Sequence, residues 1–235
     1  MILKRSTLGK FFAACALVLV LTLVTSAPFQ SVFSPLSGGE ERLIVIDAGH
    51  GGEDGGAVAP DGTVESGINL AVSKRLDALL SFLGRQTLMT RREDVSLHSP
   101  EAETLRQKKV SDLKNRVAFI NDLENAVLIS VHQNSLPSDS SVRGAQAFYA
   151  KTEGSDALAK AVQAALNTAV NERAKNEKAI YPGVYLMENV DHTAVLVECG
   201  FLSNDAESKL LTQEEHQTKL ALTIVGGYLA WETER

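Results

Sequence analysis

The stretch "LIVIDAGHGG", residues 43–52, decides the fold of this 235-residue chain. It begins with four aliphatic residues, a pattern typical of a buried strand. The glycines that follow surround one histidine, His50, and glycine allows backbone conformations that other residues rarely adopt. An imidazole held in a tight bend directly after a buried strand indicates that His50 binds something.

Strand and helix patterns alternate along the rest of the chain. We expect strands at 43–46, 86–89, 126–131, 145–149, 183–187 and 194–198, and helices at 65–83, 112–125, 155–172 and 214–231. This alternation predicts a single α/β domain with a mostly parallel or mixed sheet flanked by helices. In such folds, ligands bind at the carboxyl ends of the strands.

The N-terminal segment is expected to lie outside that domain. Three basic residues precede the apolar run 11–24, which ends in small residues. This pattern is typical of a secretory signal peptide or signal anchor, so we assign residues 1–27 to it, 28–41 to a linker and 42–235 to the folded domain. Pro28 would be a poor residue after a cleavage site, which favours a retained anchor. The protein is therefore predicted to be exported, and either membrane-anchored or secreted.

Charge and motifs exclude several classes of protein. Beyond residue 27, acidic side chains outnumber basic ones by nine, which disfavours binding to nucleic acid. The loop "GHGGEDGG" lacks the lysine of a phosphate-binding loop and the spacing of a dinucleotide fingerprint. Cys199 is the one cysteine beyond residue 27, so no disulfide framework is available there. The sequence therefore predicts a specific ligand and an apolar core.

Two histidines and two glutamates occupy positions suited to chemistry. His50 and His132 each follow a predicted strand, Glu198 ends another, and Glu65 opens a helix. Two histidines, one carboxylate and an open position form a catalytic zinc site. Zinc lowers the pKa of bound water to about 7, and a second carboxylate can carry protons. The spacing alone leaves open whether Glu65 or Glu198 is the ligand.

Five segments carry a family resemblance. In chain order they are "IDAGHGGEDGGAV", "VESGINLAV", "MTR", "SVHQNS" and "VECGFLSN". They resemble the zinc-dependent N-acetylmuramoyl-L-alanine amidases of the amidase_3 family, from Arg42 to the C-terminus. The resemblance implies that His50, Glu65 and His132 bind zinc and that Glu198 is the catalytic base and acid. The implied reaction is hydrolysis of the amide between N-acetylmuramic acid and L-alanine in peptidoglycan.

A narrower resemblance concerns the biological setting. "GAQAFYA" and "GVYLMENVDHTAVLVECGFLSN", with an N-terminal anchor and no wall-binding module, are similar to sporulation amidases of endospore-forming bacteria. This implies a role in spore cortex maturation towards muramic-δ-lactam, at the cell wall or between the forespore and mother-cell membranes. A lone catalytic domain could also require an accessory protein.

Other residues and other functions stay open. Arg91, Asn134 and Asn204 are candidates for substrate binding, although Arg91 could equally form an orienting salt bridge. Ser66 stands where the family commonly has lysine, which could alter substrate contacts. The alternatives to an amidase are a wall-binding or scaffold protein with an inactive amidase fold, and another zinc peptidoglycan hydrolase or deacetylase.

Overall fold

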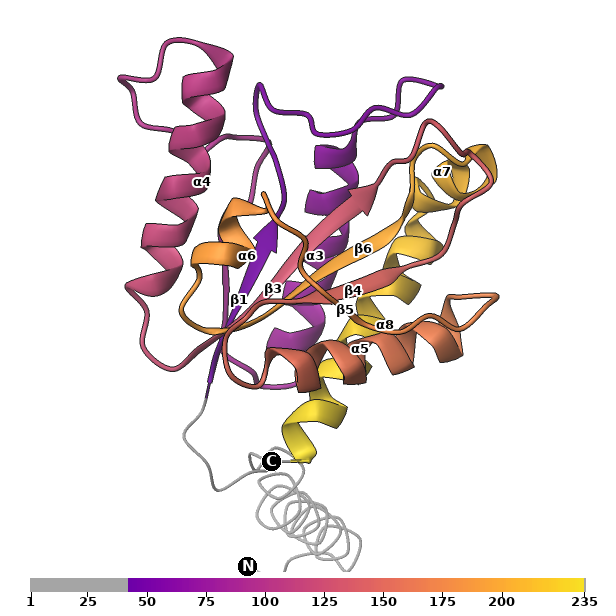
Figure 1. Cartoon of the computed structure of the whole chain (residues 1–235). Coiled ribbons are helices and arrows are strands. Elements are labelled where there is room, and N and C mark those ends of the chain that lie inside the picture. The colour runs from indigo at the N-terminus through magenta and orange to yellow at the C-terminus, as the bar shows by residue number, and fades with distance from the viewer. Residues whose placement is uncertain (1–41, 235) are drawn as a thin grey trace, which may run out of the picture. The chain divides into compact units, whose positions relative to one another are not determined.

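A mixed six-stranded sheet forms the centre of the protein (Figure 1). The computed structural model describes residues 42–234, so the predicted signal segment 1–27 and linker 28–41 lie outside the described residues. The strand order is β2-β1-β3-β6-β4-β5, and only β4 and β6 pair antiparallel. The strands are β1 (Leu43–Ala48), β2 (Thr87–Met89), β3 (Ala126–Asn134), β4 (Gln146–Tyr149), β5 (Lys178–Ala179) and β6 (Thr193–Phe201).

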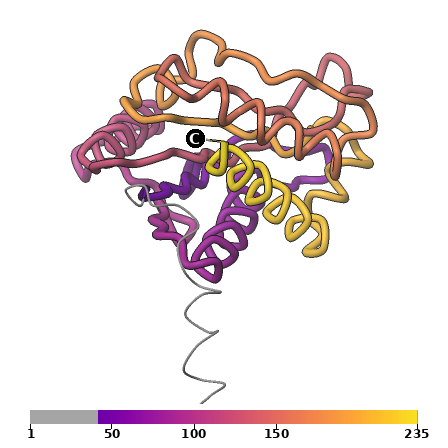
Figure 2. The backbone as a smooth tube through the Cα atoms, turned by 90° about the horizontal axis from the view of Figure 1, so that it is seen from below, coloured from indigo at the N-terminus to yellow at the C-terminus, as the bar shows by residue number. Residues whose placement is uncertain are grey.

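Helices cover both faces of this sheet, as Figures 1 and 2 show. One face packs against α3 (Glu65–Phe82), α5 (Ser155–Ala169) and α8 (Glu214–Thr233). The other face packs against α4 (Leu105–Asn121) and α6 (Tyr185–Asn189), while the short helix α7 (Asp205–Leu211) follows β6. The predicted α/β class with a flanked, mixed sheet is confirmed.

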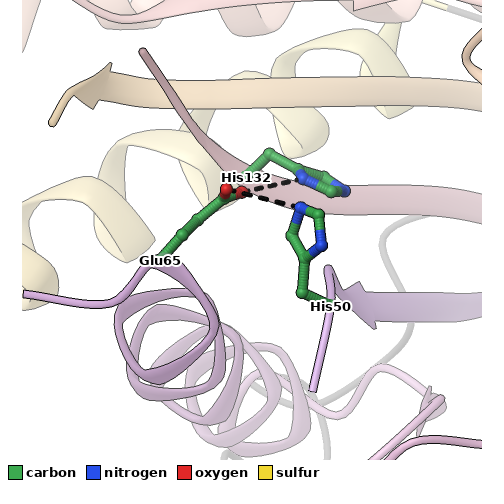
Figure 3. A group of neighbouring side chains, drawn as sticks. All are labelled: His50, Glu65 and His132. Atoms are coloured by element: carbon green, nitrogen blue, oxygen red, sulfur yellow. Dashed lines mark hydrogen bonds and ion pairs between the residues drawn. The ribbon is translucent and has the colours of Figure 1, made fainter. Parts of the chain in front are cut away.

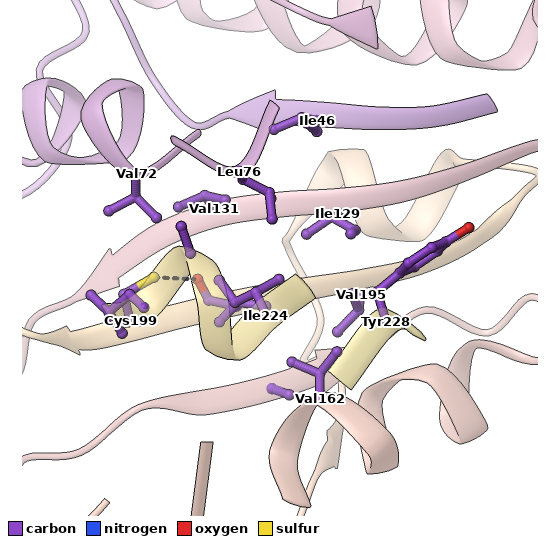
Figure 4. Close-up of a cluster of buried hydrophobic side chains, with 14 of the residues drawn as sticks. Ile46, Val72, Leu76, Ile129, Val131, Val162, Val195, Cys199, Ile224 and Tyr228 are labelled. Atoms are coloured by element: carbon purple, nitrogen blue, oxygen red, sulfur yellow. Dashed lines mark hydrogen bonds between the residues drawn. The ribbon is translucent and has the colours of Figure 1, made fainter. Parts of the chain in front are cut away.

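The central strands are buried on both faces, which explains their unbroken apolar runs. In β3, Val127, Ile129 and Val131 pack towards α3 and α8, and Figure 4 shows Ile129 and Val131 there. Leu128 belongs to the apolar cluster on the opposite face. Successive side chains on a strand point to opposite faces. His132 therefore lies on the same face as Leu128, the face that α4 and α6 cover.

Two predicted elements differ from the structure in type or by several residues at their start, and others differ by one to three residues at their ends. The strand predicted at 183–187 is wrong, because this segment contains a turn followed by α6. Leu186 and Met187 are adjacent and both join one apolar cluster, which a strand would prevent. The helix predicted at 112–125 begins earlier, because Thr104 and Gln107 form a reciprocal capping box. The short elements β5 and α7 were not predicted.

Within residues 42–234, no helix combines the length and the apolar character needed to span a membrane.

Candidate active site

The loop after β1 holds His50 in a left-handed backbone conformation, with φ of 61°. Arg116 fixes this loop by donating a hydrogen bond to the His50 carbonyl oxygen at 2.8 Å. Two glycines are required by space: a Cβ at Gly49 would lie 2.2 Å from the His132 ring, and one at Gly56 would lie 2.5 Å from Glu65 Oε2. The glycine-rich sequence therefore allows the backbone to approach these side chains.

Three side chains from different elements meet at this loop (Figure 3). His132 Nδ1 lies 3.0 Å from Glu65 Oε1, and His50 Nε2 lies 3.3 Å from Glu65 Oε2. One ligand atom from each residue can be chosen so that all three lie within 4.8 Å of one another. Glu65 comes from the start of α3 and reaches between the two imidazoles, so this triad joins the loop, a helix and β3.

The Glu65 carboxylate is fixed in its ionised form. Burial by itself raises its pKa, but hydrogen bonds and charges from His132 and His50 outweigh this and hold the pKa far below the usual value. Its oxygens also accept hydrogen bonds from the backbone of Ala57 at 2.8 Å and of Gln133 at 3.1 Å. An ionised, oriented carboxylate between two imidazoles is a suitable metal ligand.

Asp54 orients the first histidine. Its Oδ2 lies 2.9 Å from His50 Nδ1, and its Oδ1 lies 2.7 Å from Lys109 Nζ. A carboxylate bonded to one imidazole nitrogen leaves the other nitrogen free to bind a metal, as in many zinc sites. Donor types, mutual distances and this outer carboxylate all fit zinc. Of the two glutamates left open by the sequence, Glu65 is the one that lies between the histidines.

Glu198 lies beside the triad without joining it. It pairs with His132 in the register of β3 and β6, and only 7 % of its surface is exposed. Among the described residues, its buried Oε2 has no hydrogen-bond partner. Burial is the main cause that raises its pKa from 4.5 to about 7, and the Glu65 charge adds to it, although His132 and His50 lower it. A carboxyl group that titrates near neutral pH is suited to accepting and returning a proton.

A cavity of about 490 Å³ gives access to these side chains, and its wall includes His50, Glu65, His132 and Glu198. A larger hollow of about 1040 Å³ lies between α5 and α8, but it contains none of the four. The smaller cavity is therefore the candidate active site.

The three residues predicted to bind substrate occupy different places. Asn134 lines the cavity. Arg91 is buried and donates to the backbone carbonyls of Ala48, Gly49, Ser66 and Glu93, which favours a structural role over contact with substrate. Asn204 is not part of the cavity wall; it caps α7 by accepting a hydrogen bond from the Glu207 backbone at 3.0 Å. Only Asn134 is placed to touch a substrate there.

A buried charged network supports the site from below. Arg116 lies 2.6 Å from Asp47 and 2.7 Å from Asp112, and all three are buried. Burial raises the pKa of Asp47, but the Arg116 charge, with further contributions from His132 and Ser130, lowers it to about 2. This network holds β1, β3 and α4 together directly beneath the His50 loop.

Three residues that line the cavity were not predicted from the sequence: Asp54, Arg116 and Tyr181. Asp54 could have been found, since it is an acidic residue four positions after His50 in the same loop. Arg116 had no such signal, because its partner Asp47 lies 69 positions away.

An α/β sheet that brings two histidines and one carboxylate within reach of a single ion, with a second buried carboxyl group beside them, has the donor set typical of metal-dependent hydrolases. A family model described as N-acetylmuramoyl-L-alanine amidase, Amidase_3, matches residues 44–229. The chain therefore belongs to this family, and it is an N-acetylmuramoyl-L-alanine amidase.

Known relatives agree with this assignment. The germination-specific N-acetylmuramoyl-L-alanine amidase of Bacillus subtilis is 38% identical over 202 residues, covering 86% of this chain and 83% of that protein. The CwlD amidase of Clostridioides difficile, solved in complex with the GerS lipoprotein, is 37% identical with a TM-score of 0.79, covering 83% of this chain and all of that one. A second amidase, from Clostridium difficile 630, is 27% identical with a TM-score of 0.73, covering 84% of this chain and all of that one.

Proposed function

We propose that this amidase is zinc-dependent and acts on the peptidoglycan of the spore cortex, where it removes stem peptides from muramic acid on the route to muramic-δ-lactam. His50, Glu65 and His132 would hold the ion. The single observation that carries the metal assignment is the placement of Glu65 between the two imidazoles. When bound, zinc would polarise the scissile carbonyl and make a water molecule more acidic.

Glu198 would carry the protons of the reaction. Glu198 lines the cavity, and its buried Oε2 has no hydrogen-bond partner among the described residues, so this carboxyl group could accept a proton from the attacking water. The same carboxyl would then deliver this proton to the leaving amine of L-alanine, so that the group returns to its starting state. Burial raises the pKa of this carboxyl group in the zinc-free protein, which favours acceptance of a proton at this position.

The cortex setting rests on the relatives. The Bacillus subtilis relative is named as germination-specific, and others are named as probable cell wall amidases. Together with the N-terminal segment 1–27, this supports export to the cell wall, with membrane anchoring or secretion. The Clostridioides difficile structure contains a lipoprotein partner, so we also infer that an accessory protein assists this amidase.

Mass spectrometry of peptidoglycan tests the proposal. Purified protein is incubated with cortex and with vegetative peptidoglycan, each with zinc and with a chelator. We expect whole stem peptides with a new L-alanine amine only when zinc is present, and faster release from cortex. Released acetate or cleaved stem peptides would instead indicate a deacetylase or a peptidase, and equal rates on both polymers would contradict the cortex role.

A further inference from the structure

Two exposed tyrosines stand on one wall of the active-site cavity. Tyr181 is 53% exposed and Tyr185 is 37% exposed, and both line the same cavity as His50 and Glu198. A tyrosine presents a large apolar ring together with one hydroxyl group. Two such partly exposed rings in the wall of one cavity form a surface that a ligand could cover.

Contacts within the fold hold the segment that carries these rings. Pro182 and Gly183 form its turn, and the φ of 98° at Gly183 lies in a region that favours glycine. On one side, the Ile180 backbone N–H donates to the Tyr149 carbonyl at 2.9 Å. On the other side, Leu186 is buried in the apolar core.

The Tyr181 ring is also held by its neighbour. It packs edge-to-face against Phe148 of β4, with ring centroids 5.8 Å apart and an interplanar angle of 84°. The ring is therefore supported within the fold while more than half of the residue stays exposed. Because its position is already fixed, little conformational entropy would be lost when a ligand stacks on it.

We propose that Tyr181 and Tyr185 form a sugar-binding subsite, an aromatic platform for the pyranose rings of the glycan strand. A pyranose ring has a face of C–H groups and a rim of hydroxyls, which matches the apolar face and the hydroxyl of tyrosine. This inference rests on amidase action at the same cavity. The scissile amide is joined to its sugar through the short lactyl group, so the sugar must lie beside the residues that cleave it.

The rest of the cavity wall differs chemically from the segment that carries the two tyrosines. Lys109 on α4 lines another part of the wall and pairs with Asp54, so that region carries charged groups. Val184 lies between the two tyrosines in sequence and also lines the cavity. The 181–185 segment is therefore an apolar part of the wall suited to an uncharged sugar ring.

Calorimetric titration of full-length protein with peptide-free glycan strands tests the subsite. We expect Y181A and Y185A each to weaken binding about tenfold, which corresponds to the contribution of one aromatic contact, and the double variant to weaken it about a hundredfold. F82A is the matched control, because Phe82 is 76% exposed and lies outside the cavity wall. It should bind glycan like the wild type.

A second pair of variants tests whether any loss of binding results from misfolding. Y181L and Y185L keep an apolar side chain beside Phe148 but remove the aromatic face, so they should lose affinity to a similar extent while retaining the wild-type melting temperature. With polymeric substrate, the KM should rise about as much as the affinity falls, and kcat should change less than threefold. Unchanged glycan affinity in the folded double variant, or no glycan binding by the wild type at millimolar concentration, would overturn the subsite. Because titration needs no turnover, an inactive wild type that binds glycan would count against the proposed function only.

Discussion

Two clusters of buried ionisable side chains lie side by side in this protein, and they differ in how completely their charges are paired. In the cluster around Arg116, the guanidinium donates to Asp47 and Asp112 and to the carbonyl oxygens of Ala48 and His50. In the active site, Glu198 keeps a buried oxygen with no hydrogen-bond partner among the described residues. Complete pairing indicates a structural role, whereas an unpaired buried carboxylate indicates a group whose partner arrives with the reaction.

The largest expected effect separates the roles within the active site. E198Q should lose at least about a thousandfold in kcat because it removes the proton carrier, yet it should bind zinc as the wild type does. H132A should lose both zinc and activity, because it removes a ligand. Zinc content and stem-peptide release, measured on the same samples, check both expectations. Near-normal turnover by E198Q would remove Glu198 from the mechanism.

Disruption of the fully paired cluster should reduce stability. R116M leaves Asp47 and Asp112 buried without their cation, so the free energy of unfolding should fall by about 3 to 5 kcal/mol. R92M is the control: Arg92 is 60% exposed and pairs with Asp77 at 2.9 Å, so its loss should cost less than about 1 kcal/mol. Urea unfolding measures both. Equal effects of the two substitutions would show that burial of the network is unimportant.

In zinc-free protein, the two clusters should give the free energy of unfolding opposite dependences on pH. Glu198 has a raised pKa, so the native state binds the extra proton between pH 4.5 and about 7, and stability falls as pH rises through this range. The difference in unfolding free energy between E198Q and wild type should therefore grow with pH, up to about 3 kcal/mol. Asp47 has a lowered pKa, so its contribution is lost as pH falls from 3.8 to about 2. Urea unfolding at a series of pH values measures both trends. If the difference in unfolding free energy between E198Q and wild type did not change with pH, the expectation for Glu198 would be contradicted.

The smallest effect concerns the outer carboxylate. D54N weakens the acceptor that orients His50, so zinc affinity should fall about 10- to 100-fold while the fold is retained. D61N, in the same loop, is the control, because Asp61 is exposed and accepts a hydrogen bond from the Thr63 backbone N–H, away from the histidines. Competition with a fluorescent zinc chelator measures the affinities. Equal affinity in the two variants would leave Asp54 without a role at the metal.

Most of the fold could be predicted from local patterns. The strands at 43–46, 126–131 and 194–198 were recognisable because unbroken aliphatic runs are typical of strands buried on both faces. The prediction failed at 183–187, where adjacent apolar residues suggested a strand but enter one cluster from a single helical turn. The sequence also placed Glu198 at a strand end, whereas β6 continues to Phe201.

In the candidate site, too, some features could be predicted from the sequence and others could not. His50, Glu65, His132 and Glu198 could be named from the sequence because each lies at or just after the end of an apolar run, or at the start of a predicted helix. Their separate roles could not be derived from spacing, since that depends on which carboxylate reaches between the imidazoles. The network of Asp47 and Arg116 was invisible, because nothing in a local pattern links residues so far apart in the chain.

The sequence by itself determined the α/β class, the order of most elements and the four candidate site residues, because these depend on short-range periodicity and on residue chemistry. Only the tertiary structure decided that Glu65 lies between the histidines, that Glu198 is buried with an unpartnered oxygen, and that Arg91 is enclosed by backbone carbonyls. Those properties arise from the approach of distant segments. Burial and electrostatic pairing are set by such contacts, which no local stretch of sequence contains.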